Sequence, residues 1–326
     1  LSVKNHENIL HLEDEKRFEL INMDLNDAHS IRDVIIKHKP DYFINFAANS
    51  FVGVSWNMPE HVFDTNAQGV LRCLEAVKEH APDCKFYSAG SSEEFGDVDY
   101  VPQDFKHPIK PRSPYGASKA AARHLVKVYR ESYGLFAVHG ILFNHEGTKR
   151  GEEFVTRKIT KGVSRIYHAI KNGEGFAPIE LGNLSAMRDW SDSEDFVHGV
   201  WLMLNQEKPK DYILSSGETH SISEFVEKAF TAAGLKGEWS FVEKQIDGQY
   251  IKIPQLTKFV DSGSKKPYVI VNEKFYRPAE VNLLMGDSTP ARKELGWKPK
   301  FSFTDLVTRM VKNDIEENEI IPRIKG

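Results

Sequence analysis

The stretch KFYSAGSSEEFG, residues 85–96, is typical of a short buried strand that ends in a polar turn. Similar apolar runs precede and follow it, so strands are predicted at residues 17–23, 42–47, 85–89 and 135–143. Amphipathic helical patterns separate these strands, at residues 27–39, 67–79 and 113–133. The resulting order, β-α-β-α-β-α-β, predicts a parallel sheet that is covered by helices on both faces.

The predicted fold class is α/β, a Rossmann-like doubly wound parallel sheet with a smaller, interleaved C-terminal domain. Residues 1–145 plus about 186–216 are expected to form the first domain, and about 146–185 plus 217–326 the second. Ligands of such sheets bind outside the carboxyl ends of the strands. One crevice is therefore expected to be lined by the segments that follow Met23, Phe46, Ala89 and Phe143.

The pattern changes after residue 145, where longer connections and more charged residues appear. A basic amphipathic helix is predicted at residues 154–171, and a polar loop that carries Arg188 at residues 181–190. A further helix is expected at residues 193–205 and a strand at 211–215. From Ser221 onward, helical patterns alternate with charged loops.

The composition is that of an ordinary globular chain, with 40% hydrophobic residues, 28% charged residues and a formal net charge of −4. Lysines and arginines are spread along the sequence, so no nucleic-acid partner is expected. No apolar run approaches the roughly 20 residues that cross a bilayer, so no membrane partner is expected. Cys73 and Cys84 are predicted to be structural thiols, which favours a cytoplasmic location, and no metal site is expected.

A parallel nucleotide-binding sheet normally opens with a strand and a glycine-rich turn, and this sequence shows neither. No Gly-x-x-Gly-x-x-Gly or Gly-x-Gly-x-x-Gly pattern occurs in it. We therefore expect that the first strand, turn and helix of the fold are not part of this chain. As written, the chain is expected to bind a dinucleotide weakly or not at all.

The pattern Tyr115-x-x-x-Lys119 places a phenol and an ammonium one turn apart on one face of a predicted helix. The ammonium favours the phenolate and lowers the tyrosine pKa from about 10, which makes Tyr115 a usable base near neutral pH. The pattern alone is weak, because Tyr167 and Lys171 repeat it. That second copy lies in the middle of the basic helix, and we interpret it as a helix face with an exposed lysine.

Tyr115 has a context that the second copy lacks. Ser113 can cap the helix and Pro114 suits its first turn. A hydroxyl from the preceding strand end, Ser91, and the phenol at the helix start can then meet over one ligand. The alternative is that Ser91 and Ser92 are ordinary turn hydroxyls.

The residues from Ser88 to Lys119 resemble the extended short-chain dehydrogenase/reductase class. Longer motifs narrow the resemblance to the GDP-mannose 4,6-dehydratase family, and they are far more specific than Tyr-x-x-x-Lys. These motifs are GILFNHE (140–146), RGEEFVTRKI (150–159), LGNL (181–184), RDW (188–190) and YRPAEV (276–281). The resemblance runs from about Asp24 to the GWKP segment at residues 296–299.

The resemblance implies catalytic roles for Ser91 and Glu93, which match the family's threonine and glutamate, and for Tyr115 and Lys119 as the base and its partner. It implies cofactor contacts by Tyr115 and Lys119 as well. The other implied cofactor contacts are Asp24, Leu25, Phe46, Ala47, Ala48, Asn49, Ser50, His145 and Arg150. The implied cofactor is NADP, and NAD stays open because the loop that discriminates between them is absent from this sequence.

The nucleotide-sugar side is implied to be Ser50, Asn144, Val155, Lys158, Arg188, Arg277 and Glu280. These residue types suit the ligand, because a diphosphate needs several cations and a ribose or base edge suits a carboxylate. The implied small-molecule partner is GDP-mannose, and a homodimer or homotetramer is expected. By the same resemblance, the first predicted domain binds the dinucleotide and the second is the substrate domain, which binds the nucleotide sugar.

The sequence departs from the family at several of these positions. Ser91 stands where the family has threonine, so the hydroxyl is kept and the methyl is lost. Asn49 stands in place of a glutamine, and His61 in place of a tyrosine. His61 is therefore left out of the predicted site.

The implied reaction converts GDP-mannose to GDP-4-keto-6-deoxymannose and water, with hydride passing from C4 to C6 by way of bound NADP. In this hypothesis Tyr115 removes the proton of the 4-hydroxyl, Glu93 removes the C5 proton, and water is lost from C6. Such an enzyme is a hydro-lyase of nucleotide-sugar metabolism, as in GDP-fucose biosynthesis.

Two alternatives to dehydration stay open. A nucleotide-sugar 4-epimerase or 4-keto reductase uses the tyrosine, the lysine and the hydroxyl but needs no carboxylate for C5, so Glu93 favours the dehydratase. The second alternative is a non-catalytic dinucleotide-binding protein. The joint presence of Tyr115, Lys119 and Glu93 argues against it.

Overall fold

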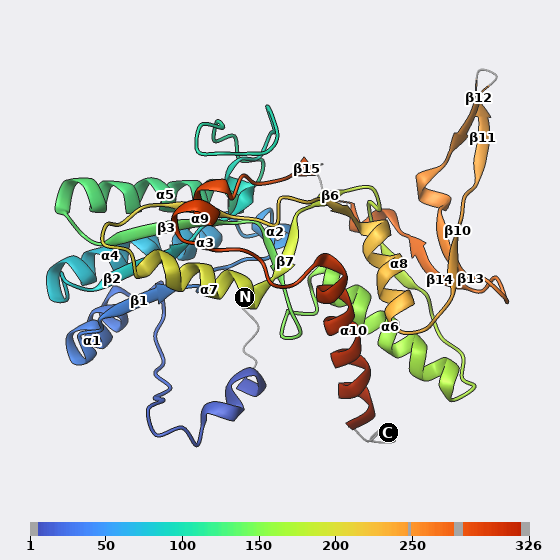
Figure 1. Ribbon diagram of the computed structural model, residues 1–326, viewed down its shortest axis with the longest axis horizontal. Coiled ribbons are helices and arrows are strands. Elements are labelled where there is room, and N and C mark those ends of the chain that lie inside the picture. The colour runs from blue at the N-terminus through green and yellow to red at the C-terminus, as the bar shows by residue number, and fades with distance from the viewer. Residues whose placement is uncertain (1–5, 247–248, 277–282, 321–326) are drawn as a thin grey trace. The chain divides into compact units, whose positions relative to one another are not determined.

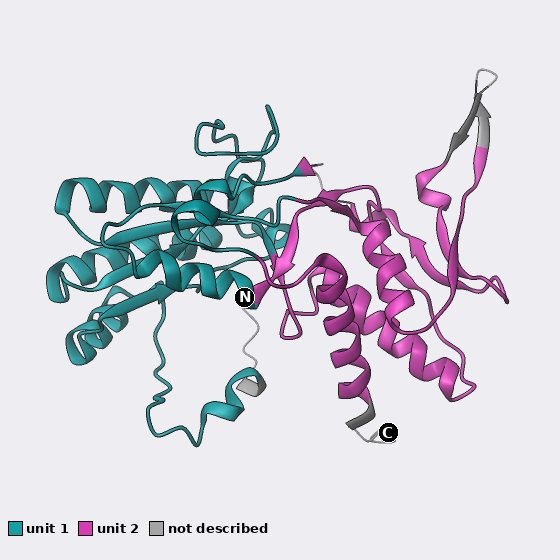
Figure 2. Ribbon diagram, in the orientation of Figure 1, with its two compact units in different colours: residues 1–144, 194–217, 284–298 teal, residues 145–193, 218–283, 299–326 magenta. Residues whose placement is uncertain are grey.

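The computed structural model describes residues 6–246, 249–276 and 283–320. The chain divides into two compact units, which Figure 2 shows in different colours. Unit 1 comprises residues 1–144, 194–217 and 284–298, and unit 2 comprises residues 145–193, 218–283 and 299–326. Compared with the predicted boundaries, residues 186–193 group with unit 2 and residues 284–298 with unit 1.

Unit 1 is built on a four-stranded sheet in which all neighbouring strands run parallel. Its strands stand in the order β1 (Tyr42–Asn45), β2 (Lys85–Ala89), β3 (Ala137–Leu142) and β8 (Tyr212–Leu214). Parallel neighbours require crossover connections, and helices provide them here. The α/β class and the parallel doubly wound sheet are thus confirmed.

Helices cover both faces of this sheet (Figure 1). One face packs against α1 (Ala28–His38), α4 (Gly69–His80) and α5 (Pro114–Tyr133), and the other against α7 (Ser193–Leu204) and α9 (Thr289–Glu294). Side chains of a strand alternate between faces. Phe86 and the paired Ala137 accordingly join the first core, and Tyr87 and the paired Val138 join the second.

Two helices of unit 1, α1 and α5, begin at capping side chains. Asp27 caps α1 by accepting a hydrogen bond from the His29 N–H (2.9 Å). Ser113 caps α5 by accepting one from the Gly116 N–H (3.0 Å), with Pro114 as the first helical residue. Gly134 ends α5 at a φ of 71°, in the left-handed region that favours glycine.

The segment between β1 and α4 is helical over more residues than predicted. The short helices α2 (Val52–Ser55) and α3 (Pro59–Phe63) are followed by a π-helix, η2 (Asp64–Gln68), which runs directly into α4. Two 3-10 helices, η1 (His6–Leu12) and η3 (Ser92–Glu94), complete the helical part of unit 1.

The strand predicted at residues 17–23 is not formed, so that prediction was wrong. These residues run as irregular chain between η1 and α1. A strand needs a neighbour to share its backbone hydrogen bonds. In the described part of the chain β1 pairs with β2, and no strand pairs with residues 17–23.

Unit 2 combines a sheet with three long helices. The sheet has the order β10 (Gly237–Ser240), β13 (Lys258–Asp261), β14 (Pro267–Val271) and β5 (Ile179–Leu181). The helices are α6 (Val155–Lys171), α8 (Ile222–Ala232) and α10 (Phe303–Ile320). Their apolar faces share one core with the sheet, which contains Phe225, Phe230 and Tyr268.

Strand content in unit 2 exceeds the prediction. Residues 237–271 form β10, β13 and β14 and the hairpin β11 (Glu243–Ile246) and β12 (Gln249–Lys252), where charged loops and helical patterns were expected. The predicted loop at residues 181–190 contains β6 (Met187–Arg188) and the start of β7 (Trp190–Asp192). These short strands pair with β9 (His220–Ser221), β15 (Leu283–Leu284) and β4 (Asn144–Glu146).

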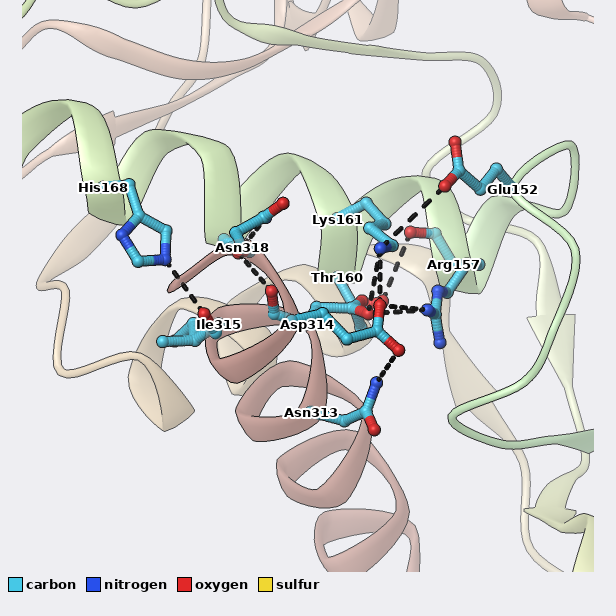
Figure 3. A network of polar contacts seen from close by, with 11 residues as sticks. Glu152, Arg157, Thr160, Lys161, His168, Asn313, Asp314, Ile315 and Asn318 are labelled. Atoms are coloured by element: carbon cyan, nitrogen blue, oxygen red, sulfur yellow. Dashed lines mark hydrogen bonds and ion pairs between the residues drawn. The ribbon is translucent and has the colours of Figure 1, made fainter. Parts of the chain in front are cut away.

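A buried polar network joins α6 to α10 (Figure 3). The Asp314 side chain is fully buried, and its Oδ1 lies 2.9 Å from Nη2 of Arg157. Lys161 Nζ lies 2.7 Å from Glu317 Oε2, and Ser164 Oγ donates to the Asp314 carbonyl. Burial raises the pKa of the Asp314 carboxyl, and the cations of α6 oppose that rise.

Cys73 and Cys84 are buried free thiols, as predicted. Burial raises the pKa of Cys73 to about 12 and that of Cys84 to about 11, so both are unreactive at neutral pH. Among the described residues, every helix is too short or too polar to cross a membrane.

Candidate active site

The turn after β2 is held in place by its own side chains. Ser91 Oγ accepts a hydrogen bond from the Glu93 N–H (3.2 Å), and Glu94 Oε1 accepts one from the Ser91 N–H (2.8 Å). This reciprocal pair is a capping box on η3. Ser91 and Glu93, both predicted to be catalytic, are therefore carried by one short, ordered turn.

The start of α5 carries the other predicted catalytic pair. Tyr115 is 8% exposed and Lys119 5% exposed, and Lys119 Nζ lies 5.9 Å from the centre of the Tyr115 ring. The ammonium donates to the carbonyl of Ala89 at the end of β2 (2.8 Å). Burial lowers the pKa of Lys119 to about 8, and the Glu94 carboxylate opposes that fall.

The helix start and the turn are in close contact. A Cβ added at Gly116 would stand 2.5 Å from the Glu93 carbonyl oxygen, well inside contact distance. Glycine at this position therefore allows α5 to approach η3. The structure thus places the four predicted catalytic residues on two segments that are in contact near the carboxyl end of β2.

The predicted cofactor segment 46–50 follows β1 and is tied to α5. Asn49 N–H donates to Asn66 Oδ1 (2.8 Å), and Asn66 Nδ2 donates to the Asn49 carbonyl (3.2 Å) and to Ser118 Oγ (3.1 Å). Asn66 lies in η2 and is 1% exposed. The Phe46 ring, by contrast, is 45% exposed.

The segment after Met23 adjoins the same loop. Asn49 Nδ2 donates to Thr65 Oγ1 (3.0 Å), which in turn donates to Asn26 Oδ1 (3.1 Å). Asp24 is exposed and accepts from the Asn26 N–H (2.9 Å), whereas Leu25 is buried and its carbonyl accepts from Arg72. The predicted strand-end segments of unit 1 are therefore linked to one another.

The remaining predicted contacts lie elsewhere in the chain. Asn144 belongs to unit 1, and its Oδ1 is buried without a hydrogen-bond donor among the described residues. His145, Arg150, Val155, Lys158 and Arg188 belong to unit 2. Arg277 and Glu280 lie outside the described residues.

Three predicted cations of unit 2 each contact a neighbouring group of the protein. Arg150 Nε pairs with Glu146 Oε2 (3.1 Å). Arg188, on β6, is 7% exposed and donates to the Met187 carbonyl (2.8 Å). Lys158 Nζ lies 3.4 Å from the centre of the Phe275 ring, and burial lowers its pKa while Glu180 opposes the change.

The second Tyr-x-x-x-Lys copy is a helix face, as predicted. Lys171 is exposed and its Nζ lies 5.8 Å from the centre of the Tyr167 ring. Sequence reasoning missed three buried polar residues of the site, Asn66, Glu94 and His139. Their signal was a polar residue within an otherwise apolar pattern, as at His139 in the middle of β3.

The chain is similar in sequence to the proteins of one known family. The family model described as GDP-mannose 4,6 dehydratase matches residues 1–310. GDP-mannose 4,6 dehydratase 2 of Arabidopsis thaliana is 44% identical over 90% of this chain and 70% of its own length. The Homo sapiens enzyme is 41% identical over 90% and 75%, and the Vibrio cholerae enzyme 38% identical over 94% and 81%.

Solved structures share the fold at lower identity. RMD from Pseudomonas aeruginosa, complexed with NADPH, superposes with a TM-score of 0.74 at 21% identity, covering 91% of this chain and 88% of that one. DesIV, a dTDP-glucose 4,6-dehydratase from Streptomyces venezuelae with NAD and TYD bound, gives 0.76 at 20%, covering 97% and 85%.

The parallel sheet, with the Tyr115–Lys119 pair beside the end of β2, defines the class of the fold, a Rossmann-like α/β fold that the solved structures share. Within that class, the family match and the identities above decide the assignment. The chain belongs to the GDP-mannose 4,6-dehydratase family, a family of nucleotide-sugar dehydratases and therefore of hydro-lyases.

Proposed function

We propose that this chain dehydrates GDP-mannose to GDP-4-keto-6-deoxymannose with Ser91, Glu93, Tyr115 and Lys119. The observation that carries the proposal is the contact between the capped turn and the start of α5. It holds the backbone of the turn that carries Ser91 and Glu93 against the start of α5, which carries Tyr115 and Lys119. A carboxylate near the Tyr115–Lys119 pair favours dehydration, because epimerisation and reduction need no base for the C5 proton.

A nicotinamide dinucleotide fits the unit 1 residues, and we propose NADP as the form used. The exposed Phe46 ring and the ordered backbone of residues 46–50 offer an apolar surface at the end of β1. The exposed carboxylate of Asp24 suits ribose hydroxyls, and His145 and Arg150 remain proposed contacts. When bound, such a dinucleotide would supply the hydride transfer between C4 and C6 of the sugar.

The side chains of this chain move the protons. Tyr115, as a phenolate stabilised by the Lys119 ammonium, removes the proton of the 4-hydroxyl, and Ser91 holds the oxygen at C4. Glu93 removes the C5 proton, which the 4-keto group has made acidic. One of these protons joins the hydroxyl that leaves C6 as water, and the other returns to C5, so the protein ends as it began.

The nucleotide-sugar side is proposed to use cations of unit 2. Lys158 and Arg188 supply positive charge for a diphosphate, and a guanidinium can bind phosphate oxygens in pairs. Ser50, Asn144 and Val155 complete the described part of this set. Arg277 and Glu280 stay in the proposal on the resemblance of their motif.

The setting of the reaction is proposed from two further points. Buried free thiols at Cys73 and Cys84 suit a reducing compartment, so we place the protein in the cytoplasm. A homodimer or homotetramer remains the expectation from the family, and light scattering of the purified protein would measure it.

Incubation of the full-length protein with GDP-mannose, without added reductant, tests the function. Mass spectrometry should show a product lighter by one water, with no net change in cofactor absorbance. Glu93→Gln should abolish that product, with at least a hundredfold loss of kcat, because the C5 proton loses its base. Glu79→Gln, an exposed carboxylate on α4, is the matched control and should keep full activity.

Other products would point to other chemistry. A product of unchanged mass would identify an epimerase. No product from GDP-mannose, but stoichiometric consumption of NADPH once a 4-keto nucleotide sugar and NADPH are supplied, would identify a reductase. Full water loss by Glu93→Gln would show that another group is the base.

A further inference from the structure

A carboxylate and an imidazole are buried together beside the catalytic turn. Glu94, the last residue of η3, and His139, in the middle of β3, both have fully buried side chains. Glu94 Oε1 accepts from the Ser91 N–H (2.8 Å) and lies 2.9 Å from His139 Nε2. Because a carboxylate only accepts, Nε2 carries the proton in this hydrogen bond.

The pair is packed tightly against the backbone of the turn. A Cβ added at Gly90 would stand 2.3 Å from His139 Nε2 and 2.7 Å from Glu94 Oε1. Glycine is therefore required where β2 passes into the turn. The backbone of His139 is also held, because its main-chain N–H donates to Asp211 Oδ1 (2.8 Å) and Asp211 pairs with Arg130 (2.6 Å).

Charged and titratable groups face Glu94 from three neighbouring elements. Lys119 lies on α5, His139 on β3 and Tyr87 on β2, and all three side chains are buried. Asp211 and Arg130 lie beyond His139. Glu94 raises the pKa of Lys119 against the effect of burial, and it adds to the burial that raises the pKa of Tyr87.

The cap alone does not account for a carboxylate at this position. Glu94 Oε2 and His139 Nδ1 are buried without a hydrogen-bond partner among the described residues. Burying an incompletely paired carboxylate is costly. A neutral amide would supply the same acceptor to the Ser91 N–H, so the feature that distinguishes Glu94 from an amide is its charge.

We propose that Glu94, held by His139, is a positioning residue whose carboxylate orients the Ser91–Glu93 turn and supplies the negative charge that acts on the Lys119 ammonium at the end of β2. This inference rests on the roles proposed above for Ser91, Glu93 and Lys119. Its two parts are separable, because the acceptor oxygen fixes the turn and the negative charge acts on the ammonium.

Two variants separate the negative charge of Glu94 from the position of its acceptor oxygen. Glu94→Gln keeps an acceptor of the same length and loses the charge. Without that charge the pKa of Lys119 should be lower, so at pH 8.5 more of the lysine is neutral than in the unaltered protein. Glu94→Gln should therefore lower kcat about tenfold at pH 8.5 and less than about twofold at pH 6.5, with KM changed less than about twofold. Glu94→Asp keeps the charge and withdraws the acceptor, so it should lower kcat by a similar factor at both pH values.

Asp314→Asn is the matched control, because Asp314 is as deeply buried as Glu94 and lies on α10 of unit 2. Whatever it does to stability, its kcat should depend on pH as in the unaltered protein. A folded Glu94→Gln variant with unaltered pH dependence would overturn the proposal.

A second measurement is independent of the reaction. In protein with ¹³C-labelled lysine, the Lys119 signal should titrate at lower pH in Glu94→Gln than in the unaltered protein and in Glu94→Asp. An equal midpoint in all three would refute the inference even if the enzyme is active. Absence of GDP-mannose dehydration by the unaltered protein would instead refute the proposed function and leave this titration to decide the role of Glu94.

Discussion

Lys119 is the residue whose chemistry depends most on its surroundings. An exposed lysine keeps its charge far above neutral pH, but burial lowers the pKa of Lys119 to about 8. Its hydrogen bond to the Ala89 carbonyl holds the group near the end of β2 without neutralising it. The cation beside the phenol of Tyr115 is therefore one that can lose its proton: its charge is present below about pH 8 and lost above it.

The activity should follow that charge. As pH rises through about 8, Lys119 becomes neutral, the Tyr115 phenolate loses its stabilising partner, and kcat should fall. Lys119→Arg keeps a permanent cation, so its alkaline decline should move upward, even though kcat at neutral pH is expected to fall about tenfold from altered geometry. A profile of kcat between pH 6 and 10 measures both effects.

The second copy of the motif provides the control for this prediction. Lys171→Arg changes the same residue type on the exposed face of α6 and should leave the profile unaltered. An identical alkaline limb for the unaltered protein and Lys119→Arg would show that another group controls it.

At the scale of elements, the α6–α10 network is a buried polar contact of unit 2. Arg157 is 6% exposed in its side chain, and Asp314 and Glu317 both lie within 3.2 Å of its Nη2. A buried guanidinium that loses a partner keeps the cost of its desolvation. The first turns of α6, which carry Val155 and Lys158, are therefore anchored by α10.

Asp314→Asn should lower the free energy of unfolding by about 3 kcal/mol at pH 7, because Arg157 keeps Glu317 but loses its buried partner. Glu152→Gln is the control from the same network (Figure 3), since Glu152 is exposed and its carboxylate lies 3.9 Å from Lys161 Nζ. That change should cost less than about 0.5 kcal/mol. Urea unfolding of both variants checks the difference, and equal losses would contradict it.

Elements with strong local signals were predictable from the sequence. β2 and α5 occur where expected, because an apolar run ends at a glycine turn and because Ser113, Pro114 and Gly134 mark both helix ends. The strand predicted at residues 17–23 was wrong, because a strand depends on a neighbouring strand that local sequence does not reveal. The strands at residues 258–261 and 267–271 are rich in aromatic and β-branched residues, yet each is too short for a clear period.

In the candidate site, too, residues with local signals were predicted and residues that depend on distant contacts were not. Tyr115, Lys119 and Glu93 were found because their spacing and motif are local. Glu94 was in view but had no assigned role, since that role depends on His139, which lies 45 residues away in sequence. Asn66 escaped for the same reason, because its contacts reach Asn49 and Ser118.

At the scale of the whole molecule, each unit has a core of its own. Unit 1 is completed by residues 284–298, which are far from its other segments in sequence. Trp297 is 1% exposed in this core, meets Phe196 edge-on, and donates from Nε1 to the Asp195 carbonyl (2.7 Å). Met285 N–H donates to the Gln103 side chain, which fixes the start of the same segment.

Trp297→Ala should destabilise unit 1 by about 3–5 kcal/mol, because it leaves a large cavity and an unpaired carbonyl. Hydrogen exchange should then show faster amide exchange in β3, β8 and α7, with α8 and β14 of unit 2 little changed. Equal acceleration in both units would show that they unfold as one body.

The return of residues 284–298 to unit 1 also constrains folding during translation. The strands of the unit 1 sheet are all synthesised before residues 284–298, so the Trp297 side of its core stays open until that segment has been made. The apolar faces of α6 and α8 likewise wait for α10, which is synthesised later still. Nascent chains therefore expose apolar surface until these later segments are made, a period in which chaperones can prevent aggregation.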